Sequence, residues 1–94
     1  MVDFFETALR KDAETLNIED LAVPPESPTL GQTLETLSIR RATGATILAI
    51  LREGNPLVSP PGDLVLSRGD HLLALGTTEQ LERLGRLIAA GRVS

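Results

Sequence analysis

The chain has no cysteine, tryptophan or tyrosine, and only two of its 94 residues, Phe4 and Phe5, are aromatic. Without cysteine it can form no disulfide and has no thiolate chemistry. Because secreted domains of this size usually rely on disulfides, we expect this domain in the cytosol. Its core has to consist of Leu, Ile, Val and Ala. A core this small stabilises a fold only weakly, which favours burial against a second copy.

Signals for membranes and nucleic acids are missing as well. The longest apolar run, Ile47–Leu51, is far shorter than the ~20 residues that a membrane-spanning helix needs. Acidic residues at Asp3 and Glu6 do not fit a signal peptide. The formal net charge is −4, and the first 26 positions hold seven acidic and two basic residues. Because negative charge and few aromatics are unsuited to binding DNA or RNA, we expect no nucleic-acid partner.

Little in the sequence supports catalysis. His71 follows Asp70, and such a pair can act as a general base, but a histidine that opens a strand is more often structural. Asp63, Asp70 and His71 have the side chains of a metal site, although their spacing is also that of a solvated, turn-rich loop. The serines lack the sequence context of a nucleophile. We therefore predict no catalytic residue, no metal site and no enzymatic activity.

The apolar pattern predicts four elements in the first half of the chain. Apolar residues recur at helical spacing over residues 2–14. A strand at Ile18–Val23 ends at a proline-rich loop, and a helix over Thr33–Ala42 ends at Gly44. Residues 45–51 are almost uniformly apolar, which predicts a strand that is covered on both faces.

Turn residues divide the second half into short strands. A tight turn at Glu53–Asn55 leads into a return strand at Leu57–Val58. Prolines interrupt this strand, which resumes at Leu64–Leu66. A turn at Gly69-Asp70 precedes a last strand, His71–Gly76.

The final helix has the clearest sequence signals. Thr77 and Gln80 have the spacing of a capping box, in which each side chain satisfies a free backbone amide. Gly91 suits the helix stop. The apolar stripe of the helix comprises Leu81, Leu84, Leu87 and Ile88. With the preceding elements, the fold class is α+β, a small mixed β-sheet with flanking helices.

Several short segments, in this order and at this spacing, resemble the TrkA-C domain, also called the RCK C-terminal domain. They are Leu30–Leu37, Gly44–Ile50, Arg52–Gly54, Pro60–Asp63, Gly69–Gly76 and the leucines of the last helix. The resemblance assigns residues 17–94 to the domain and residues 1–16 to an N-terminal helix or linker. It also implies a dimer, as in other members of the family.

The resemblance implies a regulatory role in ion transport. In the family this domain usually follows a Rossmann-type nucleotide-binding domain, and no Gly-x-Gly-x-x-Gly motif occurs in these residues. We expect a cytosolic, ligand-sensing dimerisation domain that regulates a potassium channel or transporter. Two alternatives stay open. The same module is attached to a cation/proton antiporter or another permease in some proteins, and it can serve purely structural dimerisation.

The resemblance also implies a ligand site, because several members bind cyclic di-adenosine monophosphate (cyclic di-AMP) across the dimer axis. The matching positions are Leu34, Arg40, Thr46, Ile47, Asn55 and a proline at Pro60 or Pro61. Of these, Arg40, Thr46, Ile47, Asn55 and Pro61 are the expected ligand-binding residues. An arginine fork suits a phosphate, although the eight arginines against one lysine can also reflect genome composition. Two positions depart from the best-matched binders, which have Asn in place of Thr46 and His in place of Asn55.

The dimer interface is expected in the strand at 45–51. The residues assigned to it are Ala45, Ile47 and Ala49. The near-uniform apolar character of this strand calls for cover on both faces, and a symmetric partner can provide the second.

Overall fold

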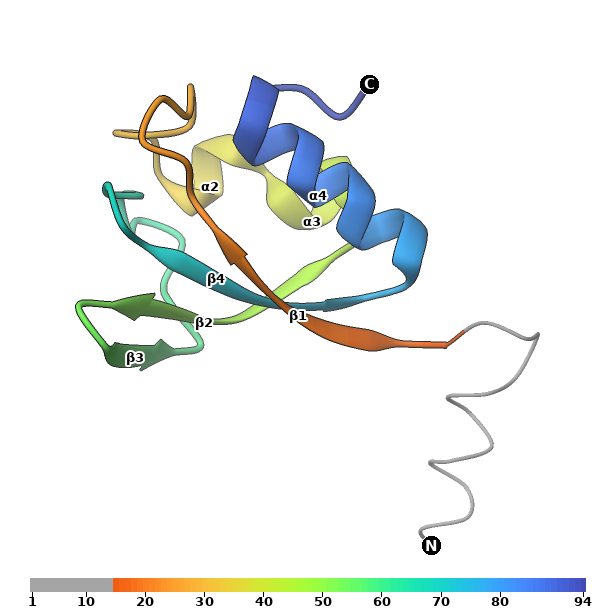
Figure 1. Ribbon diagram of the computed structural model, residues 1–94, viewed down its shortest axis with the longest axis horizontal. Coiled ribbons are helices and arrows are strands. Elements are labelled where there is room, and N and C mark those ends of the chain that lie inside the picture. Colours follow the sequence, from red (N-terminus) through yellow and green to blue (C-terminus); the bar gives the residue numbers. More distant parts are fainter. Residues whose placement is uncertain (1–14) are drawn as a thin grey trace, which may run out of the picture.

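The computed structural model describes residues 15–94 (Figure 1). The helix predicted over residues 2–14 lies outside the described residues. Within them, none of the helices combines the length and the apolar character needed to span a bilayer.

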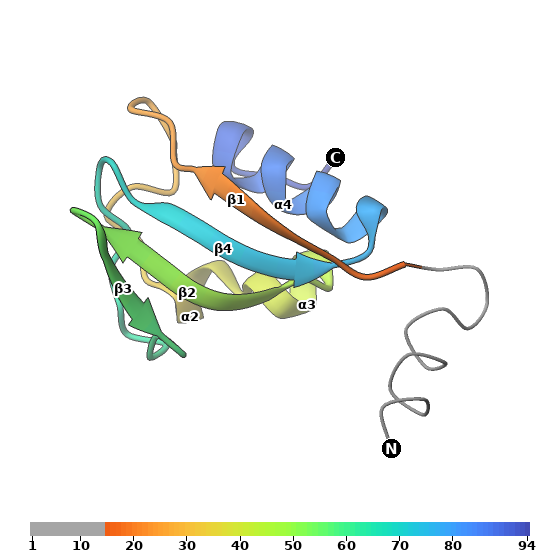
Figure 2. The same ribbon diagram turned by 60° about the horizontal axis from the view of Figure 1, so that its bottom comes forward.

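Within the described residues, four strands form one sheet, and the helices lie on a single face of it (Figure 1). The strands are β1 (Asn17–Ala22), β2 (Thr46–Arg52), β3 (Asn55–Val58) and β4 (His71–Gly76). Their spatial order is β1-β4-β2-β3, as Figure 2 shows. The α+β class is confirmed. Every strand pair is antiparallel, however, so the sheet of residues 15–94 has no parallel pairing, which the predicted mixed sheet would include.

The β2–β3 hairpin closes through Glu53 and Gly54. Both residues have positive φ, 53° and 81°, as in the two-residue turns whose twist matches that of paired strands. This is the tight turn that the sequence predicts at Glu53–Asn55. Glu53 adopts a conformation that is uncommon for a residue with a Cβ, and the pairing of Arg52 with Asn55 holds it there.

The strand predicted at Leu64–Leu66 is not part of the sheet. Instead, these residues pair with the segment before the first helix. The Leu34 N–H donates to the Leu64 carbonyl at 3.0 Å, and the Leu66 N–H donates to the Gln32 carbonyl at 2.9 Å. Only one bridge, between Thr33 and Val65, joins the two segments. The pairing is local because a helix begins immediately after Thr33, so no ladder can continue.

The single helix predicted over residues 33–42 is wrong: two short helices are present, α2 (Leu34–Leu37) and α3 (Ile39–Thr43). They meet at Ser38, which has φ 48° and whose N–H donates to the carbonyls of Leu34 and Glu35. Leu34 and Ile39 are both buried. Five residues apart on one continuous helix, they would lie about 140° apart around the axis. The break lets both enter the core.

The last helix, α4 (Thr78–Ala90), confirms its sequence signals. The Thr77 hydroxyl accepts from the Gln80 N–H at 3.2 Å, and the Gln80 side chain accepts from the Thr77 N–H at 2.9 Å. The helix ends at Gly91, with φ 81°. Its buried stripe is the predicted one: Leu81, Leu84, Leu87 and Ile88.

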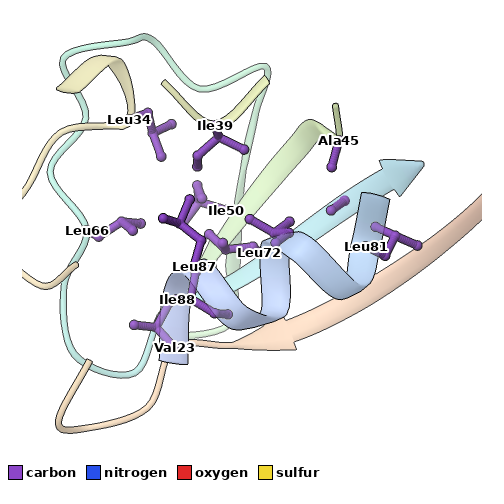
Figure 3. Packing of buried hydrophobic residues seen from close by; sticks show 12 residues of the cluster. Val23, Leu34, Ile39, Ala45, Ile50, Leu66, Leu72, Leu81, Leu87 and Ile88 are labelled. Carbon is purple, nitrogen blue, oxygen red and sulfur yellow. The ribbon is translucent and has the colours of Figure 1, made fainter. Parts of the chain in front are cut away.

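The core lies between α4, α3 and one face of the sheet (Figure 3). Ile50, Leu72 and Leu84 have no exposed surface. The other face of the sheet is uncovered by residues 15–94: Ile18 is 60 % exposed and Val58 is 72 % exposed. Residues 45–51 themselves are buried or partly buried within residues 15–94, so the exposed apolar side chains of that face lie on β1 and β3.

Candidate functional site

A surface pocket of about 440 Å³ opens between α2, α3, the start of β2 and the loop at residues 60–62. The apolar part of its lining consists of Leu34, Ile39, Ala45, Ile47, Pro60 and Gly62. The polar part consists of Glu35, Ser38, Arg40, Arg41 and Thr46. Apolar surface beside a few polar groups is typical of a small-molecule site.

Two backbone features shape this pocket. The break at Ser38 turns α3 away from the direction of α2, and Gly44, with φ 86°, ends α3 and starts the chain into β2. The Glu35 N–H donates to the Gly62 carbonyl at 2.8 Å and so holds the loop at 60–62 against α2. A Cβ at Gly62 would lie 3.3 Å from the Glu35 Cβ, so glycine allows this close approach.

Within residues 15–94, the arginines of the pocket have no protein partner. Arg40 and Arg41 are exposed, and neither donates a side-chain hydrogen bond or forms an ion pair within residues 15–94. The sequence left open an ion pair between Arg40 and Glu35, and the structure contains none. Both guanidiniums can therefore bind an anion without first breaking a protein contact.

The structure brings together only part of the predicted ligand site. Arg40, Thr46 and Ile47 line the pocket together, and so does Pro60 rather than Pro61. Asn55 does not reach the pocket of its own chain, because it follows the far end of β2. The seven residues of that strand span about 20 Å at ~3.3 Å per residue.

Three polar lining residues were missed by the sequence reasoning: Glu35, Ser38 and Arg41. Their positions depend on the helix break at Ser38, which apolar periodicity did not reveal. The available signal was proximity in the chain, since Glu35 follows Leu34, Arg41 follows Arg40 and Ser38 lies two positions before Arg40.

Two of the residues expected at a dimer interface are already buried within one chain. Ala45 is 0 % exposed and Ala49 is 5 % exposed. Small side chains on β2 are enclosed by their own neighbours, so these two have almost no surface left for a partner. Of the predicted set, only Ile47 is partly exposed; it lines the open pocket, as the buried Ala45 does.

Asp70 has a structural partner that the sequence did not suggest. Its carboxylate is 1 % exposed and accepts from Arg52 through both oxygens, with Nε to Oδ1 at 2.9 Å and Nη2 to Oδ2 at 2.8 Å. Oδ2 also accepts from the Ser67 N–H at 2.8 Å, and Arg52 donates to the Val65 carbonyl at 2.8 Å. Burial by itself raises the pKa of Asp70, but the hydrogen bonds and charge of Arg52 and the Ser67 N–H outweigh it, so this pKa is lowered.

His71 pairs with a different carboxylate from the one next to it in sequence. Its Nδ1 lies 2.8 Å from Oδ1 of Asp20 on the neighbouring strand β1, and both side chains are about half exposed. A general base made of Asp70 and His71, or a metal site made of these two with Asp63, is not assembled. Within residues 15–94, no three His, Asp or Glu side chains gather as metal ligands would.

Comparison with known proteins matches the fold and most of the chain to one family. The family model of the TrkA-C domain matches residues 18–89. "Potassium channel protein 1" of Methanocaldococcus jannaschii is 47 % identical over 55 residues, which are 58 % of this chain and 16 % of that protein. "Probable potassium channel protein 2" of the same organism is 33 % identical over 92 residues, which are 94 % of this chain and 27 % of that protein. The chain thus corresponds to a minor part of each relative.

Solved structures of RCK C-terminal domains have the same fold as this chain. The RCK_C domain dimer of S. agalactiae BusR in complex with c-di-AMP superposes with a TM-score of 0.72 at 33 % identity, covering 78 % of this chain and 90 % of that one. The RCK C domain of the potassium transport protein KtrA, in complex with the same nucleotide, gives a TM-score of 0.70 at 29 % identity, with coverages of 90 % and 92 %. BusR has also been solved with its promoter DNA, where this chain covers 43 % of the BusR chain.

The family model thus covers residues 18–89, which are 72 of the 94 residues. This range contains the four strands except the first residue of β1, the capped start of α4 and the residues that line the pocket. This chain belongs to the TrkA-C domain family.

Proposed function

We propose that this chain is a ligand-sensing dimerisation domain that regulates a potassium channel or transporter, and that its ligand is an anionic adenine nucleotide, with cyclic di-AMP as the first candidate. One observation carries the proposal. Arg40, which has no side-chain partner among residues 15–94, lines a largely apolar pocket, in a fold whose solved relatives BusR and KtrA hold cyclic di-AMP.

The pocket residues have complementary tasks in this proposal. Arg40 binds a phosphate through its planar fork. Ile47 and Pro60 supply apolar surface for a face of the adenine ring, and the Thr46 hydroxyl donates or accepts one hydrogen bond. Asn55 and Pro61 stay outside this set within one chain.

A second copy completes the site. The pocket of one chain is open to solvent, so a bound nucleotide would stay largely exposed without further cover. A two-fold symmetric ligand on a two-fold protein axis uses each contact twice, once from each chain. The RCK_C domain of the BusR relative is a dimer in its complex with c-di-AMP.

In this proposal, the nucleotide regulates transport by shifting the equilibrium between two arrangements of the dimer. A ligand that binds one dimer arrangement better than another favours that arrangement and changes the force on whatever is attached to the domain. The names of the two M. jannaschii relatives point to a potassium channel as the attached protein. DNA is not proposed as a partner, since the acidic balance of this chain opposes it.

Calorimetry tests the ligand. We expect cyclic di-AMP to bind the 94-residue chain with saturable heat, and Arg40→Ala to weaken binding by about 1.5–3 kcal/mol, the range for a hydrogen bond to a charged group. Arg86→Ala on α4 is the control, because its side chain lies outside the pocket. Absence of heat with cyclic di-AMP, ATP and NADH would leave only the dimerisation role.

Sedimentation tests the dimer. We expect the wild-type chain to sediment as a dimer, more so with the nucleotide. Ile47→Asp should release monomers or unfolded chain, because it places a charge in an apolar contact. A well-folded wild-type monomer at high protein concentration contradicts the proposal.

A further inference from the structure

The arginines described in residues 15–94 fall into two groups. Four donate to protein groups: Arg52, Arg83, Arg86 and Arg92. Three have no such partner within residues 15–94: Arg40, Arg41 and Arg68. Two of these three are adjacent on α3 and line the same pocket, and Arg68 lies outside it. Available cationic groups are therefore concentrated at the pocket.

One carboxylate accompanies them. Glu35 is the acidic residue of the pocket lining, and its backbone contact with Gly62 holds it at the wall formed by α2 and the loop at 60–62. Its side chain forms no ion pair within residues 15–94, so neither Arg40 nor Arg41 neutralises it directly. Each chain thus presents two positive charges and one negative charge to the pocket, a net charge of +1.

We infer that Arg41 is a second phosphate-binding residue beside Arg40, and that Glu35 selects phosphodiesters over nucleotides with terminal phosphates. The inference rests on the proposed function, in which the pocket holds an anionic nucleotide. A diester phosphate carries one negative charge, which matches the net charge of one pocket. A cyclic dinucleotide has two such phosphates, and a dimer has two such pockets.

A triphosphate fits this charge pattern poorly. Its several negative charges exceed what one pocket balances, and the excess meets the Glu35 carboxylate at close range, where like charges repel. With a diester, the same carboxylate is useful, because it accepts hydrogen bonds from the hydroxyl or amino groups of a nucleoside.

Calorimetry at constant ionic strength tests Arg41 with a matched pair of variants. We expect Arg41→Met to weaken cyclic di-AMP binding about tenfold or more, the factor that a hydrogen bond to a charged group supplies. Arg68→Met, which removes the third unpaired arginine but lies outside the pocket, should change it less than about twofold. Arg41→Lys keeps the charge without the fork and should fall between them. Equal effects of Arg41→Met and Arg68→Met overturn this role.

The ratio of the affinities for cyclic di-AMP and ATP tests Glu35. We expect Glu35→Gln to raise ATP binding relative to cyclic di-AMP by about fivefold or more, since one repelling charge is removed. Glu82→Gln, on the exposed side of α4, should leave the ratio unchanged. An unchanged ratio in Glu35→Gln overturns the charge selection. If the wild-type chain binds neither nucleotide, the proposed function fails and the inference with it; if the wild type binds and only the variants behave differently from expectation, the inference alone fails.

Discussion

Arginines lie near both ends of strand β2, in opposite environments. Close to its Thr46 end, Arg40 and Arg41 are exposed, line an open pocket and have no partner within residues 15–94. At its other end, Arg52 binds both oxygens of Asp70, whose side chain is 1 % exposed. We refer to Arg52, Asp70 and the groups bonded to them at Val65 and Ser67 as the Arg52–Asp70 cluster.

The difference shows which charges serve the fold and which are available to a ligand. A carboxylate taken out of water destabilises the fold unless it is paired and hydrogen-bonded, so Asp70 requires its partners. Exposed guanidiniums are satisfied by water and cost the fold little, and a ligand anion can replace that water. The comparison therefore predicts that charges in the Arg52–Asp70 cluster control stability and those at the pocket control binding.

The largest effect is expected at Asp70. Asp70→Asn should lower the free energy of unfolding by about 2–3 kcal/mol, because it leaves Arg52 without its carboxylate and turns a donor toward existing donors. The figure lies below that for a fully buried pair, since Arg52 is 35 % exposed. Urea unfolding measures it. Asp63→Asn, in the exposed loop nearby, is the control, and equal losses in the two variants would contradict the comparison.

The pH dependence of the free energy of unfolding should reflect the titration of Asp70. Because the pKa of Asp70 is lowered in the folded state, its pairing stabilises the fold fully above the usual value of 3.8. That contribution is lost as the pH falls through the lowered pKa. The difference in unfolding free energy between the wild type and Asp70→Asn should therefore shrink in strong acid. A difference that stays constant from neutral pH to about pH 2 would show that the charge of Asp70 contributes nothing.

The smallest effect on stability is expected at the pocket. Arg40→Ala and Arg41→Met should change the free energy of unfolding by less than about 0.5 kcal/mol, the usual range for exposed positions without contacts. The same variants should weaken nucleotide binding about tenfold or more. A loss of stability comparable to that of Asp70→Asn would mean that the pocket arginines also support the fold.

Sequence reasoning succeeded where the signals were local. Thr77, Gln80 and Gly91 placed both ends of α4, because capping depends on residues within one turn of the helix end. The strand at His71–Gly76 was placed to the residue, since a turn precedes it and a helix cap follows. The family resemblance assigned Arg40, Thr46 and Ile47 to one ligand site. All three line the pocket, and their role in ligand binding stays a prediction.

Sequence reasoning failed where residues that are distant in the chain determine the local structure. The helix breaks at Ser38 because Leu34 and Ile39 are both buried in the core. The apolar periodicity of one segment does not reveal this, since the core is formed by residues from several elements. The absence of a sheet strand at Leu64–Leu66 depends on the segment before α2, about thirty positions earlier, which takes up its backbone groups.

The sequence by itself determined the fold class, the family and the capped final helix, because turn chemistry, helix periodicity and short family motifs are properties of short segments. Only the tertiary structure decided which charges are paired. Asp70 is next to His71 in the chain but binds Arg52, and His71 binds Asp20 across the sheet. The register of antiparallel strands brings these residues together, and the same packing gives the side chains of Arg40, Arg41 and Glu35 no partner among residues 15–94.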